Sequence, residues 1–145
     1  MAITSAICTS FKQELLVGTH NFTATSGNTF KIALFTSDAS LGAGTTAYST
    51  SNEITNSSGT AYTAGGATLT SVTPTTDGTT AVCDFADVSY TSASFTANGA
   101  LIYNDTQSDK AVAVIAFGGD KTVSSGTFTI QFPDASASAA IIRLA

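Results

Sequence analysis

Charged side chains are scarce in this chain, and their scarcity limits what it can bind. Asp, Glu, Lys and Arg make up 10% of the 145 residues, where an ordinary globular protein has roughly 25%. The five Lys and Arg are scattered, and the formal net charge is −5. Binding to nucleic acid or to an anionic membrane surface needs clustered cations, so the sequence predicts neither partner. No apolar run reaches the ~20 residues of a membrane-spanning helix.

Residues that often carry chemistry are also few. The chain has no Trp, one His and two Cys. His20 has no recognisable nucleophile or carboxylate partner in the sequence, so we expect a hydrogen-bonded structural histidine. Cys8 and Cys83 are expected as buried thiols, and their spacing leaves a disulfide open. With His20 they lack a fourth ligand and the paired spacing of a zinc site. The sequence therefore predicts no catalytic residue, no metal site and no cofactor.

Two pairs of carboxylates lie close together in the sequence: Asp84 with Asp87, and Asp105 with Asp109. A glycosidase needs two such groups around the sugar bond. Sugar sites generally stack rings on aromatic faces, and this chain has no Trp and four Tyr. The second pair lacks the Gly-centred spacing of an EF-hand calcium loop. We therefore interpret all four as residues that make hydrogen bonds in turns.

Small hydroxyl side chains are abundant instead: the chain has 26 Thr and 18 Ser. Thr is β-branched and suits a pleated surface, and short apolar or alternating segments recur between turn residues. Strands are expected at 29–35, 67–73, 79–85, 93–103, 111–117, 127–132 and 140–144. One shared core is expected to contain Leu101, Val112, Val114, Phe128, Ile130 and Phe132. The pattern is typical of a mainly β fold, an antiparallel β-sandwich or jelly-roll-like domain with one short N-terminal helix.

Turn chemistry sets the expected strand boundaries. Pro74 to Gly78 has Pro early and Asp-Gly late, which predicts a hairpin between 67–73 and 79–85. Gly118-Gly119-Asp120 is expected to end the strand at 111–117, and residues 104–110 are expected to form a turn. The whole chain, 1–145, is interpreted as one domain with its β core at 29–35 and 67–145.

The one expected helix covers about residues 4–18. Ile7, Phe11 and Leu15 recur at a helical spacing, Thr4 can cap the start, and Gly18 can take the left-handed conformation that ends it. A helix of this length is stable only when its apolar row is docked. The docking surface can be the chain's own sheet or a neighbouring subunit.

Residues 36–66 form a long loop in this interpretation, without a strong period. Loops of this length are usually functional or partly disordered, and its apolar residues predict that it lies across a surface. The helix row and these loop residues are the predicted interface: Ile7, Phe11, Leu15, Tyr48, Ile54 and Tyr62.

Four segments carry a resemblance to a known group of proteins. The chain has a short N-terminal segment at Phe11–Phe22, a Lys-Ile-Ala-Leu-Phe-Thr strand at Lys31–Thr36, a Gly-Ala-Leu-Ile-Tyr-Asn strand at Gly99–Asn104, and a Phe-Thr-Ile-Gln-Phe-Pro strand at Phe128–Pro133. In these segments it resembles the small virion-associated proteins of tailed bacteriophages. The resemblance extends over most of the chain, and its motifs are structural.

The resemblance implies a non-enzymatic structural protein located in the virion, with no cofactor. It favours a capsid decoration (cement) protein that stabilises a phage head, with the major capsid protein or other virion proteins as partners, acting as a homo-oligomer. A low-charge surface rich in hydroxyls suits such repeated contacts. One alternative is a tail or neck component, either an adaptor or a fibre-associated module. A carbohydrate-binding module is less favoured, because Trp is absent.

Overall fold

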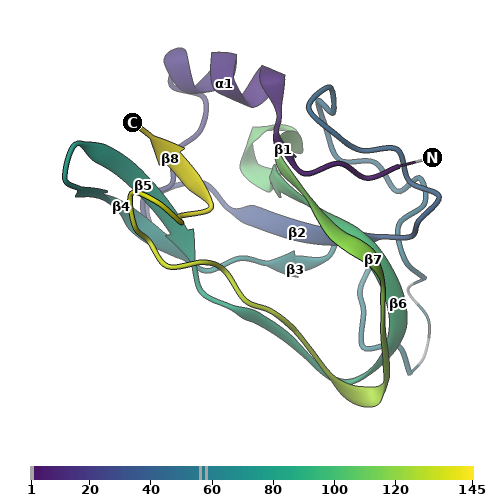
Figure 1. Cartoon of the computed structure of the whole chain (residues 1–145). Helices are drawn as coiled ribbons and strands as arrows, with labels where there is room; N and C mark the ends of the chain where they lie inside the picture. The colour runs from purple at the N-terminus through teal and green to yellow at the C-terminus, as the bar shows by residue number, and fades with distance from the viewer. Residues whose placement is uncertain (1, 56, 58) are drawn as a thin grey trace.

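The computed structural model describes residues 2–55, 57 and 59–145, and Figure 1 shows the path of the chain. Most of the regular structure is strand, and α1 is the single α-helix among the described residues. The elements in chain order are β1 (Ala6–Ile7), α1 (Thr9–Leu16), β2 (Phe30–Phe35), β3 (Ala67–Thr68), β4 (Ser71–Asp77), β5 (Thr80–Phe85), β6 (Val88–Asn104), the 3₁₀-helix η1 (Asp105–Gln107), β7 (Lys110–Ile130) and β8 (Ile142–Leu144).

Two antiparallel sheets make up the fold. The larger has the strand order β1-β7-β6-β2-β3 and the smaller the order β4-β5-β8. Figure 1 shows the smaller sheet at one side of the larger, with α1 above them. The predicted mainly β, sandwich-like architecture with one short helix is confirmed, because both sheets contribute side chains to a shared core.

The β6–β7 hairpin is the longest feature of the fold. β7 pairs with β6 from Asn104↔Lys110 to Val88↔Ile130, so the segments expected at 111–117 and 127–132 are parts of one strand. The expected break at Gly118-Gly119 is wrong. Both glycines have positive φ, and the register shifts between the pairs at Ala97 and Gly99, so the extra residues form a bulge that bends the strand without ending it.

The helix begins later than its sequence pattern predicts. Residues 4–8 are not helical: Ala6 and Ile7 form β1 and pair with Val114 and Ala113 of β7, and the Cys8 backbone N–H donates to Val112. The apolar spacing that suggested a longer helix suits a strand here because the edge of β7 offers hydrogen bonds that an isolated helix turn cannot match. The predicted helix over 4–18 is therefore confirmed only for Thr9–Leu16.

The hairpin predicted between 67–73 and 79–85 is confirmed for β4 and β5, with a turn shorter than expected. Its first arm is not one strand, because Ala67–Thr68 form β3 and pair with β2 of the larger sheet. Asp77 pairs with Thr80, which leaves Gly78 and Thr79 as the connection, with Gly78 at φ 61°. Pro74 lies inside β4 and not in the turn, at a register shift between Val72 and Thr75. An edge strand tolerates Pro at such a bulge because no neighbour needs its missing N–H.

The core lies along β2 and along the half of the β6–β7 hairpin that is uppermost in Figure 1. Phe30 is fully buried, stacks on Phe22 with ring centroids 4.3 Å apart, and lies 5.9 Å from Phe85 of the smaller sheet. Five of the six residues predicted to share this core are buried: Leu101, Val112, Val114, Ile130 and Phe132. The sixth, Phe128, is only half-buried and packs at the edge of the core.

Candidate functional site

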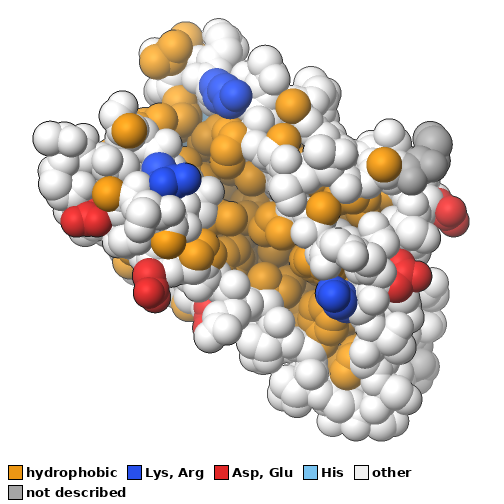
Figure 2. All heavy atoms as spheres, in the orientation of Figure 1, with side chains coloured by type: hydrophobic (Ala, Val, Ile, Leu, Met, Phe, Trp, Pro, Cys, Tyr) orange, Lys and Arg blue, Asp and Glu red, His pale blue; other side chains and the backbone are white. Residues whose placement is uncertain are grey.

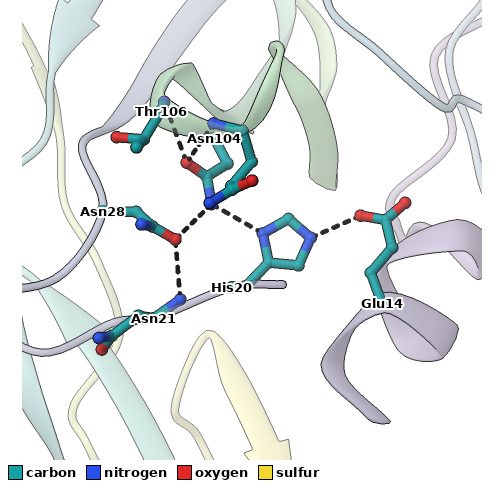
Figure 3. A network of polar contacts seen from close by, with 7 residues as sticks. Glu14, His20, Asn21, Asn28, Asn104 and Thr106 are labelled. Carbon is teal, nitrogen blue, oxygen red and sulfur yellow. Dashed lines mark hydrogen bonds and ion pairs between the residues drawn. The ribbon is translucent and has the colours of Figure 1, made fainter. Parts of the chain in front are cut away.

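A buried polar network joins the helix to the end of β6. Figure 3 shows His20 between Glu14 of α1 and Asn104, the last residue of β6. The His20 Nε2 to Glu14 Oε2 distance is 2.6 Å, and the Asn104 Nδ2 to His20 Nδ1 distance is 2.9 Å. Asn104 Nδ2 also donates to Asn28 Oδ1, which accepts from the Asn21 backbone N–H as well. The network therefore fixes α1, the segment after it and the start of β2 to one another.

The orientation of Asn104 determines which nitrogen of His20 carries the proton. Asn104 Oδ1 accepts from the backbone N–H groups of Thr106 and Gln107, so its amide nitrogen must face His20. Nδ1 of His20 is then an acceptor, and the proton is on Nε2, which donates to the Glu14 carboxylate. The side chain of His20 is 0% exposed. Both ring nitrogens have protein partners, so this imidazole has no free site with which to act as a base on a substrate.

Glu53 holds the long loop in place by accepting hydrogen bonds from residues within it. Its Oε1 accepts from the Tyr62 hydroxyl at 2.6 Å and from the Gly65 backbone N–H at 2.7 Å, and its Oε2 accepts from the Tyr48 hydroxyl at 2.7 Å. Tyr62 also accepts from the Leu34 N–H of β2. Burial, followed by the hydrogen bond to Glu53, raises the pKa of Tyr62 far above its ordinary value. The loop is thus attached to the sheet by its own carboxylate and hydroxyls.

The six predicted interface residues lie in different environments. Phe11, Ile54 and Tyr62 are 1%, 4% and 2% exposed, so the chain's own core already covers them. Ile7, Leu15 and Tyr48 are half-buried and pack against that core, and Tyr48 stacks on Tyr103 with centroids 4.5 Å apart. The apolar residues of the loop are therefore explained by contacts within the chain. A partner contact for the six stays a prediction.

The carboxylate pairs do not converge on a site. Asp84 Oδ1 accepts from the next backbone N–H, and Asp87 Oδ1 accepts from the Phe132 N–H, which are local and strand-to-strand hydrogen bonds. Asp105 Oδ1 lies 3.6 Å from Lys31 Nζ. Among residues 2–55, 57 and 59–145, no three His, Cys, Asp or Glu side chains come together as a metal site.

Both cysteines are free thiols. Cys8 is 0% exposed at the start of α1, and burial, followed by the charge of Glu14, raises its pKa to about 11. Burial alone raises the pKa of Cys83 to about 11. Thiols with a raised pKa are poor nucleophiles near neutral pH, because the reactive form is the thiolate. Within the described part of the chain, α1 is also too short to cross a membrane.

An open groove with a mainly apolar lining lies along one side of β7. Figure 2 shows hydrophobic side chains gathered in a hollow that runs down one face of the molecule. The lower part of this β7 groove, about 480 Å³, is lined mainly by Ile115, Phe117, Phe128, Ile130, Phe132 and Ile141. An adjoining hollow of about 310 Å³ shares Ile115 and Ile141 and continues to Ile7 of β1. Of the described residues, Lys121 is the one charged residue that lines the groove.

Comparisons with models of protein families, with curated proteins and with solved structures found no match for this chain.

Sequence reasoning missed the roles of Glu14, Glu53 and Asn104. For Asn104 a local signal exists, because an Asn before Asp-Thr-Gln commonly caps a turn with its side chain, as it does here for η1. No local pattern connects Asn104 to His20, which is 84 positions away. The β7 groove was also missed, because the expected core set did not show that one side of β7 stays uncovered.

Proposed function

We propose that the chain is a non-enzymatic structural protein of a tailed-bacteriophage particle, and that it binds the capsid as a decoration protein. The observation that carries the proposal is the position of the resembling segments. Lys31–Thr36 and Gly99–Asn104 are neighbours in one sheet, paired from Lys31↔Tyr103 to Phe35↔Gly99. The segments that carry the resemblance thus form the centre of the architecture, and a decoration protein functions through its shape and surface.

The use of the polar side chains supports this proposal. The single imidazole and the Glu53 carboxylate are both occupied by contacts that hold the fold together. An enzyme of the hydrolase type would need at least one of its nucleophile, base and orienting groups free toward a cleft. The β7 groove, by contrast, is apolar and has a single charged residue on its lining, Lys121. Such a surface is suited to protein contact.

The outer face of the β6–β7 hairpin gives further support. Hydroxyl side chains pair across the strands, Ser89 with Thr129 at 3.0 Å and Thr96 with Thr122 at 2.8 Å, and the Asn98 amide donates to the Asp120 carboxylate at 2.9 Å. These exposed hydroxyls make a polar face that is almost without charge. A surface of this kind can form hydrated contacts at many equivalent sites of a shell without strong repulsion between copies.

Copy number in the particle tests the proposal. Quantitative mass spectrometry of purified particles should find this chain in numbers comparable to the capsomers of the shell. Purified chain added to particles that lack it should sediment with them and saturate at the same number. A single small ring per particle would assign the chain to the tail or neck instead, and absence from purified particles would overturn the virion role.

A further inference from the structure

We infer that the β7 groove receives the C-terminal end of helix α1 from a second copy of the same chain. The inference starts from the fold: Phe85 of the smaller sheet packs on Phe30 of β2. The loop residue Tyr62 contacts Tyr90 and Phe95 of β6. Among the described residues, no element covers the corresponding part of β7. Phe117 and Phe128 therefore remain half-buried beside an open hollow.

The outer edge of β7 is also largely unpaired. β1 pairs with it only at Ala113 and Val114, and the Ala116 N–H donates to the Ser5 hydroxyl. In the described part of the chain, no backbone hydrogen bond reaches this edge beyond that point. An unpaired edge beside apolar side chains is the kind of surface that native proteins cover in their assembled state.

The occupant must be convex and apolar. Two copies that brought their grooves face to face would enclose a void, because both are hollow at the same place, and voids are unfavourable in protein interiors. The chain itself presents one adjacent pair of strongly exposed large hydrophobic residues: Leu16 is 89% exposed and Val17 is 66% exposed. They lie together at the end of α1, and none of the described residues covers them.

A contact from helix end to groove joins two different surfaces and is therefore heterologous. Repeated from copy to copy, such a contact closes into a ring when its rotation divides a full turn and otherwise extends into a filament. The contact would give the proposed homo-oligomer a specific surface. It does not depend on where in a particle the chain is located, so purified chain is sufficient to test it.

The charges near the contact predict its response to salt. Lys12 is exposed one helical turn before Leu16, and Lys121 lies on the lining of the groove. An apolar contact with two cations nearby keeps or gains affinity as salt screens their repulsion. If an acidic partner occupied the groove instead, the affinity would decrease as salt is raised.

The test measures self-association by sedimentation and light scattering over a concentration series. The double variant Leu16→Ser/Val17→Ser should weaken association by at least about 30-fold in Kd, the effect of losing a binding hot spot. Two groove variants, Ile141→Asp and Phe117→Asp, should weaken it similarly, and having two keeps the test valid if one of them fails to fold. Val72→Ser, at an exposed apolar residue on β4, is the matched control and should leave association unchanged.

Mixing the variants gives the decisive result. The helix-end variant keeps an intact groove, and a groove variant keeps an intact helix end, so an equimolar mixture should form a dimer of one copy of each and nothing larger. A wild-type chain that stays monomeric overturns the inference, and so does association that survives loss of Leu16 and Val17. A monomer would leave the proposed decoration role intact, because copy number in particles tests that role separately.

Discussion

Asn104 is the residue on which the buried polar network depends. Replacing it with Ala removes the hydrogen bond to Nδ1 of His20, whose side chain is 0% exposed, and leaves Asn28 Oδ1 and the Gln107 N–H with one partner fewer each. A buried polar group left unpaired costs about 1–3 kcal/mol, so we expect Asn104→Ala to lower the free energy of unfolding by at least about 3 kcal/mol. Urea denaturation followed by circular dichroism measures this change.

A matched control lies on the same strand. Asn98 is half-buried, and its amide donates to Asp120 in a hydrogen bond that is open to solvent, so Asn98→Ala should change stability by no more than about 0.5 kcal/mol. Equal destabilisation by the two variants would show that the network contributes nothing beyond the loss of an ordinary surface hydrogen bond.

Gly66 is the residue where the backbone leaves least room. Its φ is +82°, and a Cβ added there would overlap the carbonyl of Ile32 in β2. Both the left-handed backbone and the overlap oppose a side chain, so Gly66→Ala should cost about 3 kcal/mol or more. Gly118 has a similar φ of +75° but open space around it, and Gly118→Ala should cost about 1–2 kcal/mol. Thermal or urea midpoints that fail to separate the two variants would contradict this account.

Among the elements, β2 and β7 differ in how completely they are covered, and this difference is measurable. Phe30 of β2 is fully buried among other rings, so Phe30→Ala should cost about 3–5 kcal/mol. Phe128 of β7 contacts Phe95 and Phe117, with centroids 5.0 Å and 6.1 Å away, but one side faces the β7 groove. Phe128→Ala should therefore cost the isolated chain distinctly less. Equal shifts of the denaturant midpoint would mean that the groove is closed in solution.

The elements that sequence reasoning recovered are those with a local pattern. β2 and the β4–β5 hairpin are specified by apolar runs and turn residues within about ten positions. The start of α1 was misplaced because the pairing of Ala6 and Ile7 with β7 is a contact between distant segments. The bulge at Gly118-Gly119 was taken for a strand end because sequence shows the glycines and does not show that the pairing with β6 resumes after them.

The loop at 36–66 also shows that local sequence does not reveal contacts between distant segments. The prediction that this loop contains no strand is confirmed for its described residues. Ile54 and Tyr62 of this loop are buried in the chain's own core, and a partner contact for them stays a prediction. The attachment of this loop depends on three hydrogen bonds to Glu53, and a carboxylate in a region without periodicity gives no sign of them.

At the scale of the whole molecule, the buried thiols and tyrosine hydroxyls predict that the free energy of unfolding decreases at alkaline pH. Burial raises the pKa of Cys8 and of Cys83 from 9.0 to about 11, and that of Tyr90 from 10.0 to about 12. Burial and the hydrogen bond to Glu53 raise the pKa of Tyr62 as well. For each group the unfolded chain loses its proton at a lower pH than the folded chain does, so unfolding releases protons in this range.

Stability should therefore be fully present below pH about 9 and should decline as pH rises, first with the two thiols and then, above about 10, with the tyrosines. Urea midpoints measured at intervals between pH about 7 and about 11 would show this decline. Cys8→Ser/Cys83→Ser should flatten the first part of the profile, and Tyr62→Phe should flatten the second, because each removes a group whose proton is held more tightly in the folded state. Lys12→Gln, at an exposed site on α1, is the control and should leave the shape unchanged. A wild-type profile that stays level through pH about 11 would mean that these side chains are less buried in solution than the fold requires.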